Sequence, residues 1–158
     1  MEDKAEIYET LRFIVSTHRS EFEKRRSYQW KAIAGIITVM ALMAAARVTE
    51  KTSAIVSTIP DKLVWACLLV IAIVGSAFLC YVHIANAVNK TIAHRAENAL
   101  QESLNGNDIR PLDLYSNLPK KPTLSGLFSV GNGGFWGWLF ESIILLIFAV
   151  FSAIVITS

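Results

Sequence analysis

Glycine and proline are absent from residues 1–34, and no charged residue follows Glu141. The first absence removes the two residues that most strongly disfavour a helix, so we expect one helix to run straight into the first apolar block. Cysteine is scarce: Cys67 and Cys80 lie about 20 Å apart on one helix, which excludes a disulfide between them. No apolar stretch of the kind found in a cleavable signal peptide precedes Trp30. We therefore expect the first apolar block to stay in the protein as a signal anchor and not to be cleaved off.

The chain has little of the chemistry that catalysis requires. His18, His83 and His94 have no cysteine or acid at the spacing of a metal site. No nucleophile–base pair and no pair of carboxylates is recognisable. We therefore expect no enzymatic activity, metal or cofactor. A net charge of +2, with acids and bases interleaved, gives no reason to expect a nucleic-acid partner.

Apolar residues make up 53% of the chain and are concentrated in three blocks. Each block approaches the length that a helix needs to cross a bilayer. The pattern predicts an all-α integral membrane protein with transmembrane helices at 32–47, 63–85 and 135–158. The side chains expected to anchor these helices at the membrane interfaces are Trp30, Arg47, Trp136 and Trp138.

The distribution of lysine and arginine predicts the orientation. Residues 1–31 carry seven, the 48–62 loop two, residues 89–134 five, and residues 148–158 none. Because basic loops stay on the cytoplasmic side, we expect the N-terminus inside and the C-terminus outside, with 48–62 as a short outer loop.

Helical patterns continue beyond the apolar blocks. In residues 1–31 apolar positions recur every three or four residues and predict an amphipathic cytoplasmic helix. A similar stripe over 86–105 predicts a cytoplasmic extension of the second span, ending near Asn105-Gly106. Together these helices form a hairpin with a cytoplasmic stalk.

Residues 106–134 have a different character. Three prolines break any long helix there, yet the segment is too apolar for a solvated linker. We expect it to dock, either on the stalk or on the membrane surface.

Glu141 is the single acid within 135–158. One interpretation is a carboxylate that reaches the nearby cytoplasmic interface, where its energetic cost is small. The other is a residue that lines a polar path or pairs with another helix. His83 is the partner expected from its matching depth in the second span.

The second span carries a face of mostly small side chains. Such a face either packs closely against another helix or lines a pore. Ala41 and Ala45 give the first span a lesser version of it. Both interpretations need a partner helix, so we expect a homo-oligomer. The residues of the face are Ala72, Ser76, Cys80, His83 and Ala87.

The charged helix Glu6–Arg26, the hairpin Ala32–Ala85 and the trailing helix Asn86–Leu104 resemble small bacterial two-span effectors of the SLATT type, which are associated with antiviral conflict systems. The resemblance is architectural and covers about two thirds of the chain, and the third span departs from it. It implies an oligomer that permeabilises or depolarises the bacterial inner membrane, and it assigns no site residues.

From these patterns we expect a homo-oligomeric inner-membrane protein that forms a pore or channel. Two other functions fit the same patterns. One is a non-conducting scaffold or accessory subunit that binds a cytoplasmic partner protein. The other is a small proton- or solute-coupled transporter.

Overall fold

A computed structural model describes residues 4–49, 58–105, 114–118 and 132–157. Within these ranges the chain forms three long helices: α1 (Lys4–Val48), α3 (Asp61–Leu104) and α5 (Asn132–Thr157). Each contains a segment long and apolar enough to cross a membrane. The prediction of an all-α protein with three such helices is therefore confirmed.

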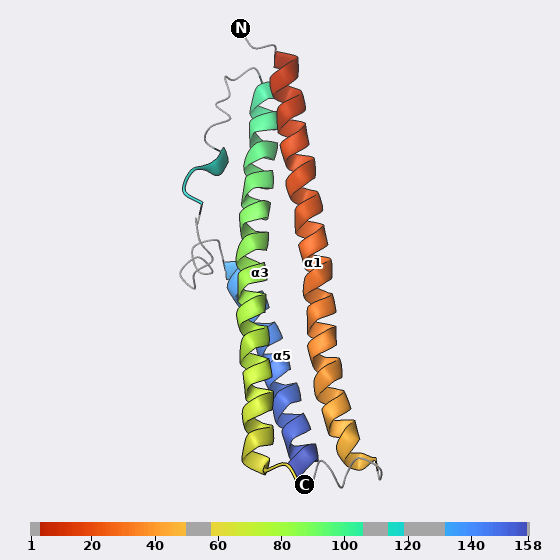
Figure 1. Cartoon of the computed structure of the whole chain (residues 1–158). Helices are drawn as coiled ribbons and strands as arrows, with labels where there is room; N and C mark the ends of the chain where they lie inside the picture. The colour runs from red at the N-terminus through yellow and green to blue at the C-terminus, as the bar shows by residue number, and fades with distance from the viewer. Residues whose placement is uncertain (1–3, 50–57, 106–113, 119–131, 158) are drawn as a thin grey trace.

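Helices α1 and α3 lie side by side and antiparallel, each about 65 Å long at 1.5 Å per residue (Figure 1). Helix α5 is shorter and packs against the half of this pair that is nearer the α1–α3 connection. Both long helices are unbroken, as the absence of helix-breaking residues in 1–34 and the stripe over 86–105 predicted. Helix α3 ends at Leu104, next to the expected stop at Asn105-Gly106, and the backbone N–H of Asn105 still bonds to the carbonyl of Gln101 at 3.1 Å.

All three helices meet closely at Gly75. A Cβ atom on Gly75 of α3 would lie 2.9 Å from Ile36 Cδ1 of α1 and 3.0 Å from Leu145 Cδ1 of α5. Glycine at this position therefore lets three backbones approach one another. The apolar cluster beyond it comprises Met40, Ala44, Val64, Leu68, Ala72, Ala149, Ala153 and Ile156.

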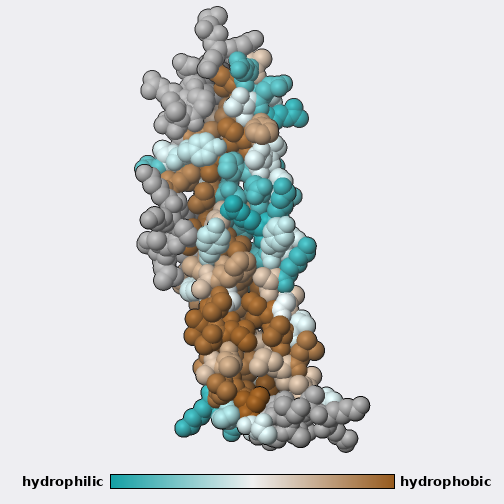
Figure 2. Space-filling view, viewed as in Figure 1, coloured by the Kyte–Doolittle hydropathy of each residue, from teal (hydrophilic) through white to brown (hydrophobic). Residues whose placement is uncertain are grey.

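The outer surface changes character along the bundle. Figure 2 shows a nearly continuous apolar belt over the half that contains α5, and polar side chains on the α1 side of the other half. Large apolar side chains such as Ile73, Phe140 and Phe151 are more than half exposed in this belt. Such exposure is expected when lipid replaces water as the solvent.

Part of the 106–134 segment lies within the described residues. Leu114 is buried against Leu11 of α1 and Ala96 of α3. Arg95 Nη1 donates hydrogen bonds to the carbonyl oxygens of Leu114 (3.1 Å) and Ser116 (2.6 Å). Residues 114–118 thus dock on the α1–α3 pair, whereas 106–113 and 119–131 lie outside the described residues. Helix α5 begins at Asn132, three residues before the predicted start of the third span.

Candidate functional site

Glu141 faces the interior of the bundle. It is 7% exposed, and its Oε2 lies 2.9 Å from Nε2 of His83 on α3. The structure therefore brings together the two residues that matching depth had paired. The Glu141 side chain lies buried between helices within one chain. This position corresponds to the interpretation of Glu141 as a residue that pairs with another helix.

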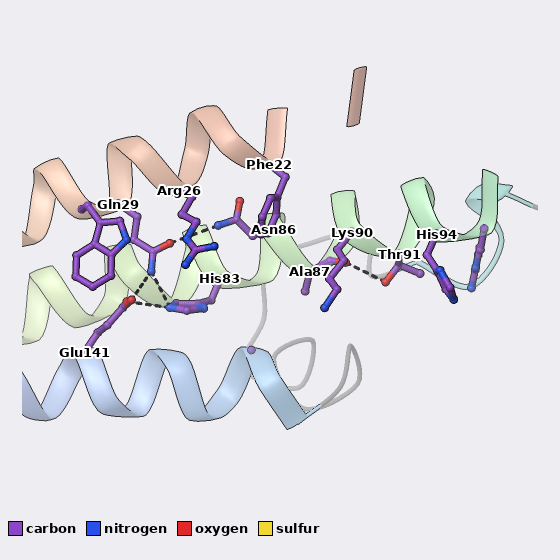
Figure 3. A pocket seen from close by; sticks show the side chains of 13 residues that line it. Phe22, Arg26, Gln29, His83, Asn86, Ala87, Lys90, Thr91, His94 and Glu141 are labelled. Carbon is purple, nitrogen blue, oxygen red and sulfur yellow. Dashed lines mark hydrogen bonds and ion pairs between the residues drawn. The ribbon is translucent and has the colours of Figure 1, made fainter. Parts of the chain in front are cut away.

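A third helix contributes Gln29, which the sequence reasoning did not identify. This α1 residue is 4% exposed, and its Nε2 donates to Glu141 Oε1 at 2.5 Å. Asn86 Nδ2 on α3 donates to Gln29 Oε1 at 3.4 Å. Figure 3 shows these side chains converging from the three helices. We call Gln29, His83, Asn86 and Glu141 the polar cluster.

Hydrogen-bond chemistry places a proton within this cluster. Gln29 must present its N–H₂ to Glu141 because its carbonyl oxygen accepts from Asn86. His83 Nε2 lies 3.0 Å from Gln29 Nε2, an amide nitrogen that has no lone pair to offer. The 2.9 Å contact between His83 Nε2 and Glu141 Oε2 requires one proton between these two atoms, because each is otherwise an acceptor; we assign it to His83 Nε2. Each carboxylate oxygen then accepts one hydrogen bond from another helix.

The predicted small face of α3 packs against α5 along most of its length. Ser76 Oγ lies 2.7 Å from Ser142 Oγ, and Trp138 Nε1 donates to the Ser76 carbonyl at 2.9 Å. Ala72 is buried in the apolar cluster, Cys80 is half-buried, and Ala87 lines a cavity. Within one chain, the contacts of this face are therefore those of helix packing, the first of its two interpretations.

The predicted interface anchors divide into two groups. Trp30 and Trp136 are 53% and 63% exposed. Trp138 instead directs its indole N–H at α3, and the side chain of Arg47 lies outside the described residues. Both cysteines are free thiols, as their spacing predicted.

A second polar layer lies further along α1 and α3. His18 Nδ1 is 3.2 Å from Asn89 Oδ1, and its Nε2 is 3.5 Å from the Tyr115 hydroxyl. Arg19 and Glu97 form an ion pair across the same two helices. In the described part of the chain, no three His, Cys, Asp or Glu side chains gather as metal ligands.

A cavity of about 730 Å³ opens beside the polar cluster, between α1, α3 and the start of α5. Gln29, His83, Asn86 and Glu141 form one end of its wall. The rest of the wall carries three basic side chains among uncharged ones. The basic residues are Arg26, Lys90 and Arg95, and the others are Phe22, Trp30, Ala87, Thr91, His94 and Gly134. The site thus combines a buried polar cluster with a basic cavity. No protein-family model, curated protein or solved structure matches this chain.

Proposed function

We propose that this chain assembles in the membrane as a homo-oligomer in which α1 of each copy faces the centre, and that the assembly conducts ions or small solutes. We place it in a bacterial inner membrane with its N-terminus in the cytoplasm. The distribution of basic residues supports this orientation, and the architectural resemblance supports the source.

The observation that carries the proposal is a small-residue face on α1. Ala34, Thr38, Ala41 and Ala45 recur at intervals of three and four residues and are all exposed. No described atom lies within 4 Å of a Cβ built on neighbouring Gly35. The corresponding face of α3 is covered by α5, so α1 offers the surface on which a second copy is able to pack closely.

Thr38 gives this face its polar character. Its hydroxyl donates to the Ala34 carbonyl at 2.8 Å, so it remains able to accept a hydrogen bond from water or a permeating solute. Small side chains on both sides of Thr38 leave room for water at the centre of a ring of α1 helices. The proposed path therefore runs along α1, whereas Glu141 holds each subunit together.

A scaffold is the second candidate. Helices α1 and α3 continue well beyond α5, and residues 4–28 alone span about 37 Å. Phe13, in this projecting part of α1, is 70% exposed and offers an apolar contact for a cytoplasmic partner protein. A scaffold oligomerises or binds its partner without conducting.

Thiol chemistry separates these candidates. In a C67A/C80A background, Thr38→Cys introduces a thiol on the α1 face, and Ile73→Cys provides a matched thiol on the lipid-facing side of α3. A conducting oligomer predicts oxidative cross-linking of T38C between copies, its modification by charged, water-soluble thiol reagents, and flux from proteoliposomes that this modification blocks. I73C should show none of these effects.

The outcomes distinguish the two candidates. Cross-linking of T38C without modification or flux supports a non-conducting scaffold. A T38C variant that cross-links no better than I73C refutes assembly through α1.

A further inference from the structure

We propose that the cavity beside the polar cluster binds the phosphate of an anionic phospholipid headgroup. The inference rests on the membrane location of the apolar belt and goes beyond the proposed oligomer, because every residue that forms the site comes from one chain. The basic side chains of the cavity and its position beside the apolar belt support this proposal.

The cavity wall carries three basic side chains and one acid. Arg26 of α1, and Lys90 and Arg95 of α3, all line it (Figure 3 labels the first two). Neither Arg26 nor Lys90 forms an ion pair with an acid among the described residues. Arg26 and Lys90 thus offer two cationic groups for favourable interactions with a phosphate group.

The one acid in the wall does not neutralise these cations. Glu141 lies at the end of the wall farthest from His94, and its two oxygens contact Gln29 and His83 (Figure 3). Lys90 lies two helical turns beyond His83, about 10 Å along α3. The hydrogen bonds of Glu141 are therefore made within the polar cluster, whereas Arg26 lies one helical turn from Gln29 on α1 and Lys90 lies further along α3.

The position of the cavity fits a lipid. Trp30, which directly precedes the first apolar block, and Gly134, in the first turn of α5, both line it, and so do Phe22 and His94 in the polar parts of α1 and α3. Basic residues at this level meet the phosphate groups of the adjacent leaflet. The acyl chains of the same molecule then extend along the exposed apolar faces of the helices.

Lipid retention by the purified full-length protein tests the site. Native mass spectrometry in the presence of phosphatidylglycerol should show one preferentially bound lipid per chain. The R26Q/K90Q variant should bind it at least tenfold more weakly, and R26K/K90R should bind it nearly as well as wild type. Melting temperatures in neutral detergent should be unchanged, because Arg26 and Lys90 are both exposed.

The matched control is K24Q/K31Q. It removes the same charge from exposed positions on α1 that flank Arg26 and do not line the cavity. Equal loss of lipid by this control, or no loss in R26Q/K90Q, overturns the proposed site. Binding of phosphatidylcholine as tight as that of phosphatidylglycerol overturns recognition of an anion.

Competition identifies the source of the phosphate. Inorganic phosphate and glycerol phosphate, each added in excess, should leave the bound phosphatidylglycerol in place if the acyl chains contribute to affinity. Displacement of the bound lipid by either compound assigns the basic cavity to a soluble phosphate. This result overturns the lipid as the source of the phosphate.

Discussion

The imidazole of His83 rests directly on Gly137. A Cβ atom built on this glycine would lie only 2.8 Å from His83 Cε1, closer than real Cβ contacts allow. Glycine on α5 therefore lets the His83 ring lie between the helices, with its Nε2 directed at Glu141. Close helix packing and the hydrogen bonds of the polar cluster depend on the same backbone position.

Gly137→Ala should destabilise the bundle by about 1–3 kcal/mol, because the new methyl group must displace either the His83 ring or α5. Unfolding in mixed detergent, followed by tryptophan fluorescence, measures the change. Gly134→Ala is the matched control: no described atom lies within 4 Å of its Cβ, and alanine favours the helix. A G137A variant as stable as G134A would contradict the observed packing of His83.

The contact between His83 and Glu141 predicts energetic coupling. We expect a double-mutant cycle of His83→Ala and Glu141→Ala to give an interaction free energy of about 1–3 kcal/mol, because each single change leaves a buried partner unsatisfied. Free energies of unfolding of the four proteins provide the measurement. Additive effects would refute the pairing.

Gln29→Leu should cost about 1–3 kcal/mol, although it preserves the size of the side chain. The substitution removes the donor to Glu141 Oε1 and the acceptor for Asn86, and both of these residues are buried. Ser27→Ala, at an exposed position two residues away, should change the stability by less than about 0.5 kcal/mol. If Q29L unfolds like S27A, the hydrogen bonds of Gln29 contribute nothing to the bundle.

Local sequence patterns were sufficient to predict the long helices. The absence of glycine and proline from residues 1–34 and the apolar periodicity are both short-range properties, and they predicted that α1 and α3 would be continuous. Gln29 was missed because it lies in the charged stretch before Trp30, outside the first apolar block. Continuing the stripe of Leu11, His18 and Phe22 in steps of three and four reaches Gln29 and then buried Ile33.

Contacts between helices were harder to predict. Depth in the membrane was enough to pair His83 with Glu141, because both lie near the same ends of their spans. Depth does not give the rotation of a helix, so the small face of α3 favoured helix packing but also fitted pore lining. The Ser76–Ser142 contact depends on the rotation and register of α5, which no local pattern of residues specifies.

Ala41→Leu should weaken assembly without destabilising the subunit. Ala41 is exposed on the α1 face, so leucine meets no neighbour within one chain but prevents close approach of a second copy. Light scattering of the detergent-solubilised protein should show a shift to smaller species, with an unchanged melting temperature. Val74→Leu, on an exposed face of α3, should leave the oligomer intact. An A41L protein of wild-type mass would exclude this face as the interface.

Leu114→Ala should release residues 114–118 from the α1–α3 pair. Leu114 is 4% exposed and packs on Leu11 and Ala96, so truncation removes most of the apolar contact that holds this short segment. We expect a loss of about 2–3 kcal/mol in the local docking free energy, seen as faster amide hydrogen exchange at residues 114–118. Exchange in the apolar belt should not change, because α5 packs there independently of this segment. Tyr115→Ala, at a 53% exposed neighbour, should have a much smaller effect. If Y115A accelerates exchange as much as L114A, then burial of Leu114 does not hold the segment in place.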